Sequence, residues 1–194
     1  MLQDFGLYFE LGYQHILDIK GYDHILFVAA LCGIYLLKDW RKVLILVSAF
    51  TIGHSVTLAL SLFNQMRMNT PLIEFLIPVT ILVTALVNIF SKSFSQKNIK
   101  FNYFMAFVFG LIHGMGFSNY LKSLLGSDTF IITQLLAFNL GLEVGQLVIV
   151  IIIMLFSYIT MQLLKVKQRE WNLFLSSAIF GMALIMAAER FSTL

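Results

Sequence analysis

The chain has 194 residues, of which 59% are hydrophobic and only 12% are charged. A soluble domain carries roughly twice that charged fraction, so the charges are too few to cover a water-facing surface, and lipid is the natural solvent. The formal net charge of +3 does not indicate nucleic-acid binding, because the basic residues stand in short clusters between apolar runs, where they set membrane topology.

Six apolar segments predict an all-α, polytopic transmembrane helix bundle of about six spanning helices. In chain order they cover residues 25–37, 43–66, 72–91, 101–121, 129–164 and 171–188. None of them alternates polar and apolar side chains, so a membrane barrel is not supported. We find no linker and no clear internal repeat. We therefore expect residues 1–194 to form a single transmembrane domain, with residues 1–20 as a polar or interfacial N-terminal segment.

Two of the segments have lengths that do not suit a simple span. A helix needs roughly 20 residues to cross the hydrocarbon, and the segment 25–37 reaches that length only if Asp23 and His24 enter the membrane. The segment 129–164 is too long for a straight spanning helix at about 1.5 Å per residue. We expect a break in it, for which Asn139, Gly141 and Gly145 are suitable places.

The basic residues are distributed unequally between the two sets of loops. Nine of the 13 stand on one side, namely Lys38, Arg41, Lys42, Lys92, Lys97, Lys100, Lys165, Lys167 and Arg169. The other side has Lys20, Arg67, Lys122 and Arg190. Because cytoplasmic loops are enriched in Lys and Arg, the larger set marks the cytoplasm and places both termini outside.

Five ionisable side chains stand within or beside the apolar segments: Asp23, His24, His54, His113 and Glu143. Such groups are costly in lipid, so they face the bundle interior and usually mark function. Helical spacing places the imidazoles of His54 and His113 at a similar depth in the outer half. Imidazole and carboxylate ligands together suit a divalent transition metal such as Zn²⁺, Ni²⁺ or Co²⁺.

Polar neighbours share helix faces with two of these residues. Thr51 and Ser55 lie on the face of His54. Asn139 and Gln146 lie on the face of Glu143. We expect these side chains to orient the ligands as a supporting shell.

Three further groups of residues have simpler interpretations. Glu74 begins its segment, where we expect a cap that favours the helix dipole. His15 lies in the polar N-terminal segment, where we expect an exposed or interfacial side chain. Gly110, Gly114 and Gly116 around His113 favour close helix packing.

The ordered strings HILDIKGYDHILF, FTIGHSVTLAL, EFLIPVTI, FGLIHGMGFSNYL and FNLGLEVGQ resemble the HupE/UreJ family of small bacterial membrane proteins, over about residues 12–150. The resemblance implies a bacterial inner-membrane protein that acts as a nickel or cobalt permease, or as an accessory protein for hydrogenase and urease. The family's His-Asp-His motif corresponds to His15, Asp23 and His24. The His15–Asp23 spacing is longer than in the nickel-transport motif, and the second motif is reduced to His113, so the chain looks like the second HupE/UreJ subgroup.

The leading hypothesis is a permease that binds a divalent transition-metal ion at Asp23, His24, His54, His113 and Glu143. The alternative is an intramembrane zinc-dependent hydrolase, in which Asp23 or Glu143 acts as the base and Ser55 or Asn139 as oxyanion donor. A third possibility is a non-catalytic membrane assembly factor. The expected partners are lipid and the metal ion, with metalloenzyme maturation proteins as further possibilities.

Overall fold

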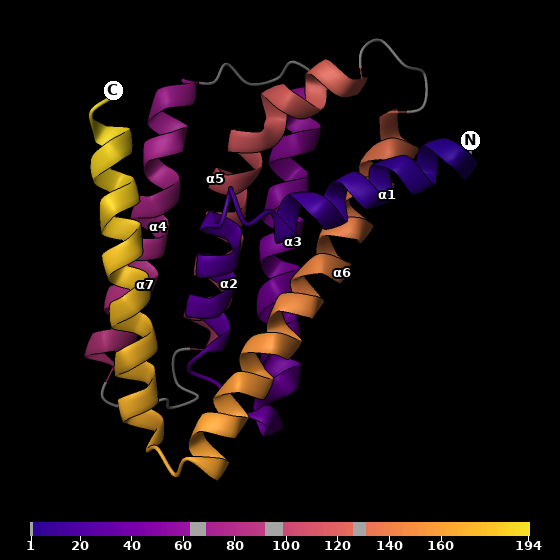
Figure 1. Cartoon of the computed structure of the whole chain (residues 1–194). Helices are drawn as coiled ribbons and strands as arrows, with labels where there is room; N and C mark the ends of the chain where they lie inside the picture. Colours follow the sequence, from indigo (N-terminus) through magenta and orange to yellow (C-terminus); the bar gives the residue numbers. More distant parts are fainter. Residues whose placement is uncertain (1, 63–68, 92–98, 126–130) are drawn as a thin grey trace.

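A computed structural model describes residues 2–62, 69–91, 99–125 and 131–194 of the chain, and every regular element within them is helical. Figure 1 shows long rods surrounding one short central helix, with both chain ends at the same end of the bundle. The helices are α1 (Leu2–Leu17), α2 (Asp23–Cys32), α3 (Trp40–Leu62), α4 (Thr70–Phe90), α5 (Ile99–Leu125), α6 (Ile131–Tyr158) and α7 (Gln168–Phe191). A 3-10 turn, η1 (Leu37–Asp39), precedes α3, and a π-helical turn, η3 (Ile159–Leu163), follows α6. The predicted all-α, polytopic bundle is confirmed.

Five helices in the described part of the chain, α3 to α7, are long and apolar enough to cross a membrane. The remaining predicted segment, residues 25–37, which comes first in the chain, forms only the 10-residue α2. At about 1.5 Å per residue α2 is about 15 Å long, which is half of a hydrocarbon core of about 30 Å. The expectation that residues 25–37 continue as one helix to Leu37 was therefore wrong.

A helix that ends inside a membrane bundle needs partners for the carbonyl groups of its last turn. The backbone amides of Gly33 and Tyr35 donate to the Ala29 and Cys32 carbonyls. Polar side chains from two neighbouring helices bond one further carbonyl of α2 and one in the turn that follows it. Asn88 on α4 donates to the Ala30 carbonyl at 2.7 Å, and Gln168 on α7 donates to the Ile34 carbonyl at 2.9 Å. These two amides allow α2 to end at Cys32 without orphaned backbone acceptors at those positions.

The long segment 129–164 does not break where we expected. The candidate span Ile131–Gln162 is helical throughout, with 32 residues and a length of about 48 Å. The N-terminal part of this long helix packs against α1, which lies obliquely beside it (Figure 1). Gly141 and Gly145 face this helix, because an added Cβ would collide with the Phe9 carbonyl or the Ile16 side chain. The glycines therefore allow close packing and do not break α6.

The loops rich in basic residues gather at one end of the bundle. Gln168 bonds the Ile34 carbonyl, and Arg169 bonds the Ser91 carbonyl at 3.0 Å, so three connections meet there. The opposite end holds the ion pair between Glu74 and Arg190. Arg67, Lys92 and Lys97, which contributed to the predicted charge asymmetry, lie outside the described residues.

Two helix pairs cross through the same short motif, Phe-x-x-Gly. On α3 and α5, a Cβ at Gly53 would collide with the Phe107 carbonyl, and one at Gly110 with the Phe50 carbonyl. This reciprocal contact brings the two backbones together, as small residues do in membrane bundles.

The pair formed by α1 and α6 repeats this arrangement. A Cβ at Gly12 would collide with the Phe138 carbonyl, and one at Gly141 with the Phe9 carbonyl. The two helix pairs thus share one crossing motif, although we found no clear repeat in the sequence.

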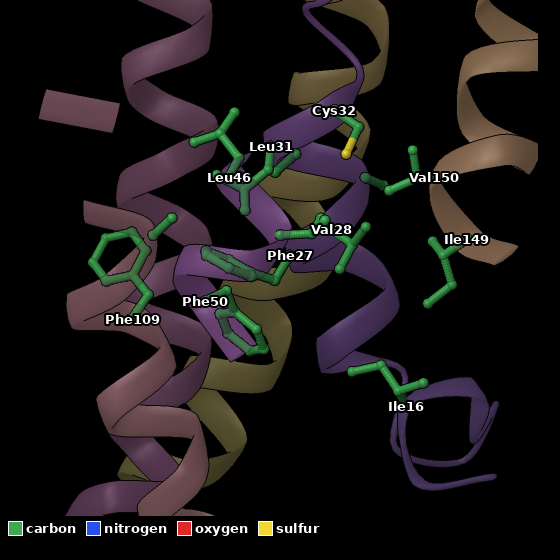
Figure 2. Packing of buried hydrophobic residues seen from close by; sticks show 14 of the residues in the cluster. Ile16, Phe27, Val28, Leu31, Cys32, Leu46, Phe50, Phe109, Ile149 and Val150 are labelled. Atoms are coloured by element: carbon green, nitrogen blue, oxygen red, sulfur yellow. The ribbon is translucent and has the colours of Figure 1, made fainter. Parts of the chain in front are cut away.

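The apolar core lies around α2 and the crossing of α3 with α5. Figure 2 shows Phe27 and Leu31 of α2 beside Phe50 and Leu46 of α3, with Phe109 of α5 on one side. All five side chains are buried. This core carries the imidazoles described next.

Candidate metal site

Four imidazoles from four helices meet in the half of the bundle that lies towards the two chain ends, which we call the outer half after the predicted topology. Ligand atoms of His15, His24 and His54 all lie within 4.8 Å of one another. The fourth ring, His113, has its centroid 5.2 Å from that of His24. The structure therefore brings His24 and His54 together with His15, while His113 lies beside His24 and outside this group of three.

The glycine crossings explain how these imidazoles are brought together. His54 directly follows Gly53 on α3, and His113 stands one turn after Gly110 on α5. His15 stands at the same distance after Gly12 on α1. Phe9-x-x-Gly12-x-x-His15 and Phe107-x-x-Gly110-x-x-His113 thus share one seven-residue pattern. The α1–α6 crossing at Gly12 and the α3–α5 crossing at Gly110 are alike, so His15 and His113 are both directed towards the centre of the bundle.

Hydrogen bonds to Nδ1 orient two of the rings. His24 Nδ1 lies 2.9 Å from Oδ1 of Asp23, and His113 Nδ1 lies 2.9 Å from the Phe109 carbonyl oxygen. Nδ1 carries the proton in both contacts, because a carboxylate and a carbonyl are acceptors. The Nε2 atom of each ring then keeps a free lone pair, as in many metal-binding histidines.

The ring nitrogens that make no hydrogen bond are evidence for a bound ligand. Within the described part of the chain, the buried Nε2 atoms of His15, His24, His54 and His113 have no hydrogen-bond partner, and neither does Nδ1 of His54. A buried polar atom without a partner costs about 1–3 kcal/mol. Four such atoms gathered in one place therefore require an explanation, and a metal ion that accepts their lone pairs provides one.

An outer cavity of about 190 Å³ connects this imidazole cluster with the end of the bundle that carries both termini. Imidazoles of His15, His24 and His113 line its deep end. Its other polar lining residues are Asp18, Asp23, Glu74 and Arg190. The cavity is polar and contains three carboxylates against one guanidinium, so a cation is the favoured occupant.

The structure does not bring Glu143 into the imidazole cluster. Its Oε1 accepts a hydrogen bond from the Ser48 hydroxyl at 2.7 Å, and it is absent from the group of ligand atoms within 4.8 Å of one another. Ser48 lies six residues before His54 on α3, which places this contact more than one turn deeper in the bundle. Asp23, in contrast, contacts the cluster through His24.

The expected supporting residues make other contacts. Thr51 donates to Gln146 Oε1 at 2.7 Å, and the Ser55 hydroxyl bonds the Thr51 carbonyl of its own helix at 2.7 Å. The Oδ1 atom of Asn139 has no hydrogen-bond partner among the described residues. His54 has no partner on either nitrogen, so these side chains do not orient its ring.

Two expectations about individual residues were wrong. His15 is not an exposed or interfacial residue, because its Nε2 is buried and its ring lies 4.7 Å from that of His24. Glu74 is not the cap of its helix, because the Asn69 side chain accepts from the Leu72 amide there, and Glu74 instead pairs with Arg190. The family resemblance already placed His15 in the His-Asp-His motif, and the Phe-x-x-Gly-x-x-His pattern shared with α5 is a second signal for it.

The fold and the site define a class of protein: a multi-pass membrane protein with a buried histidine cluster below an outer cavity. The family model described as HupE / UreJ protein matches residues 1–190, and the chain belongs to the HupE/UreJ family. The comparison with curated proteins and the comparison with solved structures give no match.

Proposed function

We propose that this protein binds a divalent transition-metal ion at His15, His24, His54 and His113, and transports it across the bacterial inner membrane. The observation that carries the proposal is the set of buried Nε2 atoms without partners, contributed by four different helices. The HupE/UreJ family is associated with nickel or cobalt transport or with accessory functions, which agrees with a metal as the substrate.

The donor atoms favour a first-row transition metal over Ca²⁺ or Mg²⁺. Imidazole suits zinc, copper, iron and nickel, whereas Ca²⁺ and Mg²⁺ prefer oxygen ligands. The Asp23 carboxylate behind His24 strengthens that ring as a donor, because it holds the proton on Nδ1. Protons compete with the metal for imidazole lone pairs, so binding weakens as the pH falls.

The position of the site agrees with uptake from outside. The acidic lining of the outer cavity attracts cations towards the imidazoles, which lie at the deep end. Each of the four helices that carry a histidine supplies one ring. A bound ion would therefore link α1, α2, α3 and α5. Binding would then favour one arrangement of these four helices over others.

Uptake of Zn²⁺, Ni²⁺ and Co²⁺ into proteoliposomes tests the proposal. We expect saturable uptake by the wild type with at least one of these ions, and its loss in His15→Ala. Gln14→Ala is the matched control, because Gln14 is the preceding residue on α1, is exposed, and donates a hydrogen bond to Glu10. No uptake of any of the three ions by folded wild-type protein, or equal uptake by His15→Ala and Gln14→Ala, would contradict the proposal.

A further inference from the structure

Below the imidazoles, three helices carry a phenylalanine one turn deeper in the bundle. On α2, Phe27 follows His24 by three residues. On α3, which runs in the opposite direction, Phe50 precedes His54 by four residues. On α5 Phe109 precedes His113 by the same four residues. This spacing places the rings one helical turn from the imidazoles on each helix.

The three phenylalanine rings form one layer. The centroid of Phe27 lies 5.0 Å from that of Phe50 and 5.5 Å from that of Phe109. Figure 2 shows the three side chains at one level, between Ile16 on one side and Leu31 and Leu46 on the other. All three are buried, and Phe27 and Phe50 are fully inaccessible to solvent.

The layer touches the ion site directly. The rings of Phe27 and Phe50 each have centroids 5.2 Å from that of His113, and Phe50 also lies 6.2 Å from His24. An ion held by the imidazoles would therefore have an apolar floor on its inner side.

A second cavity lies on the other side of this floor. It has a volume of about 70 Å³, and Phe109 forms part of its wall. Leu31, Leu46 and Met105 also line it, and each stands four residues beyond one of the three phenylalanines. Among the residues that the structure describes, none lines both this inner cavity and the outer one.

The inner cavity leads towards the end of the bundle that carries the basic loops. Its surface is almost entirely apolar, and Val83 and Val87 in its wall are exposed on α4. Its polar lining residues are Tyr35, Thr84, Asn88 and Asn102. At that end Asn102 donates to the Tyr35 hydroxyl at 3.2 Å. The phenylalanine layer therefore lies between the imidazoles and the residues Leu31, Leu46 and Met105 that line the inner cavity.

We propose that Phe27, Phe50 and Phe109 form the inner gate of the transport path, closed in this structure. This inference rests on the proposed function. Hydrophobic constrictions stop ions because the ion would lose its water without gaining ligands. Release towards the cytoplasm then requires the rings to separate, which a shift of the short helix α2 against α3 and α5 would achieve.

Cysteine accessibility tests the gate without any metal. In a Cys32→Ala background, Thr84→Cys places a thiol in the inner cavity, and a small, membrane-impermeant, cationic methanethiosulfonate is added from the outside. We expect slow reaction with the gate intact, and a rate at least about tenfold higher once Phe109→Ala is added, which corresponds to about 1.4 kcal/mol. The control is Phe104→Ala, the same substitution on α5 at a side chain that is 60% exposed.

Equal reaction rates in the Phe109→Ala and Phe104→Ala variants would overturn the gate. Truncating a buried phenylalanine leaves a cavity and is destabilising. Phe109→Leu is therefore measured as well, with size-exclusion chromatography as the check of folding. Phe109→Leu should accelerate the reaction less than Phe109→Ala, and an unchanged rate in every folded variant counts against the gate.

Metal content separates failure of the gate from failure of the proposed function. If the gate is correct, Phe109→Ala retains the metal content of the wild type, because all four imidazoles remain, while its ion flux in proteoliposomes rises above that of Phe104→Ala. A wild-type protein that retains no metal would overturn the proposed function, and with it the gate as part of a transport path. Retained metal with unchanged flux and labelling would overturn the gate alone.

Discussion

The Asp23 carboxylate lies 2.9 Å from Nδ1 of His24, and Nε2 of the same ring faces the other imidazoles without a partner among the described residues. The carboxylate thus fixes which ring nitrogen carries the proton and which is available to an ion. This arrangement resembles the carboxylate–histidine–metal triads of known metal sites.

Replacing Asp23 should weaken metal binding without preventing folding. We expect Asp23→Ala to lower the affinity about 10–100-fold, as loss of such partners does in other metal sites. Asp23→Asn should cost less, because its amide oxygen still accepts from Nδ1–H. Isothermal titration with Zn²⁺ at constant pH measures both variants. An affinity of Asp23→Ala equal to that of the wild type would show that the carboxylate has no such role.

A methyl group at the α3–α5 crossing should destabilise the protein. The added Cβ of Gly110→Ala would collide with the Phe50 carbonyl, and backbone cannot move aside as a flexible side chain can. We expect a loss of about 1–3 kcal/mol or more, typical of overpacking. Gly181→Ala on α7 is the control, because nothing lies within 4 Å of its added Cβ. Thermal unfolding in detergent compares the two, and equal midpoints would contradict the close crossing.

Glu143→Gln should leave metal content unchanged. The glutamine keeps an oxygen that can accept from the Ser48 hydroxyl, and the structure gives Glu143 no contact with the imidazoles. Elemental analysis of purified protein checks this, with His54→Asn as the reference for loss of a ligand. A fall in metal content as large as that of His54→Asn would make Glu143 a ligand, as the sequence suggested.

The charge asymmetry predicts that the basic loops face the cytoplasm. In a Cys32→Ala background, a membrane-impermeant maleimide applied outside intact cells should label Lys20→Cys and leave Lys100→Cys unlabelled. Both positions are exposed, Lys20 between α1 and α2 and Lys100 in the first turn of α5. The parent without cysteine supplies the background signal. The reverse pattern would invert the topology and make the outer cavity a cytoplasmic one.

The class of fold could be predicted from sequence because lipid imposes one strong constraint. Backbone polar groups must be satisfied within each span, so long apolar runs become helices. The course of α2 could not be predicted, because its early end depends on amides from α4 and α7 that come close only in the folded bundle. The absence of a break in the described helix Ile131–Gln162 could not be predicted either, because Gly141 packs against α1 only in the folded bundle.

The site was predictable only in part. His24, His54 and His113 stand beside or within apolar runs, where an imidazole is conspicuous. His15 stands in a polar segment, and only the crossing at Gly12 carries it into the bundle. Glu143 is equally conspicuous in sequence, yet it bonds Ser48, because helix rotation and depth decide which polar residues meet.

X-ray absorption spectroscopy on metal-loaded, purified protein tests the central claim most directly, because it reports the atoms bound to the ion. We expect one ion per chain with a first shell of nitrogen at about 2.0–2.1 Å for zinc, and with the multiple scattering characteristic of several imidazoles. His15→Ala should lose one imidazole from this shell or lose the ion. An absence of bound ion, or a shell dominated by oxygen or sulfur, would contradict the four-histidine site.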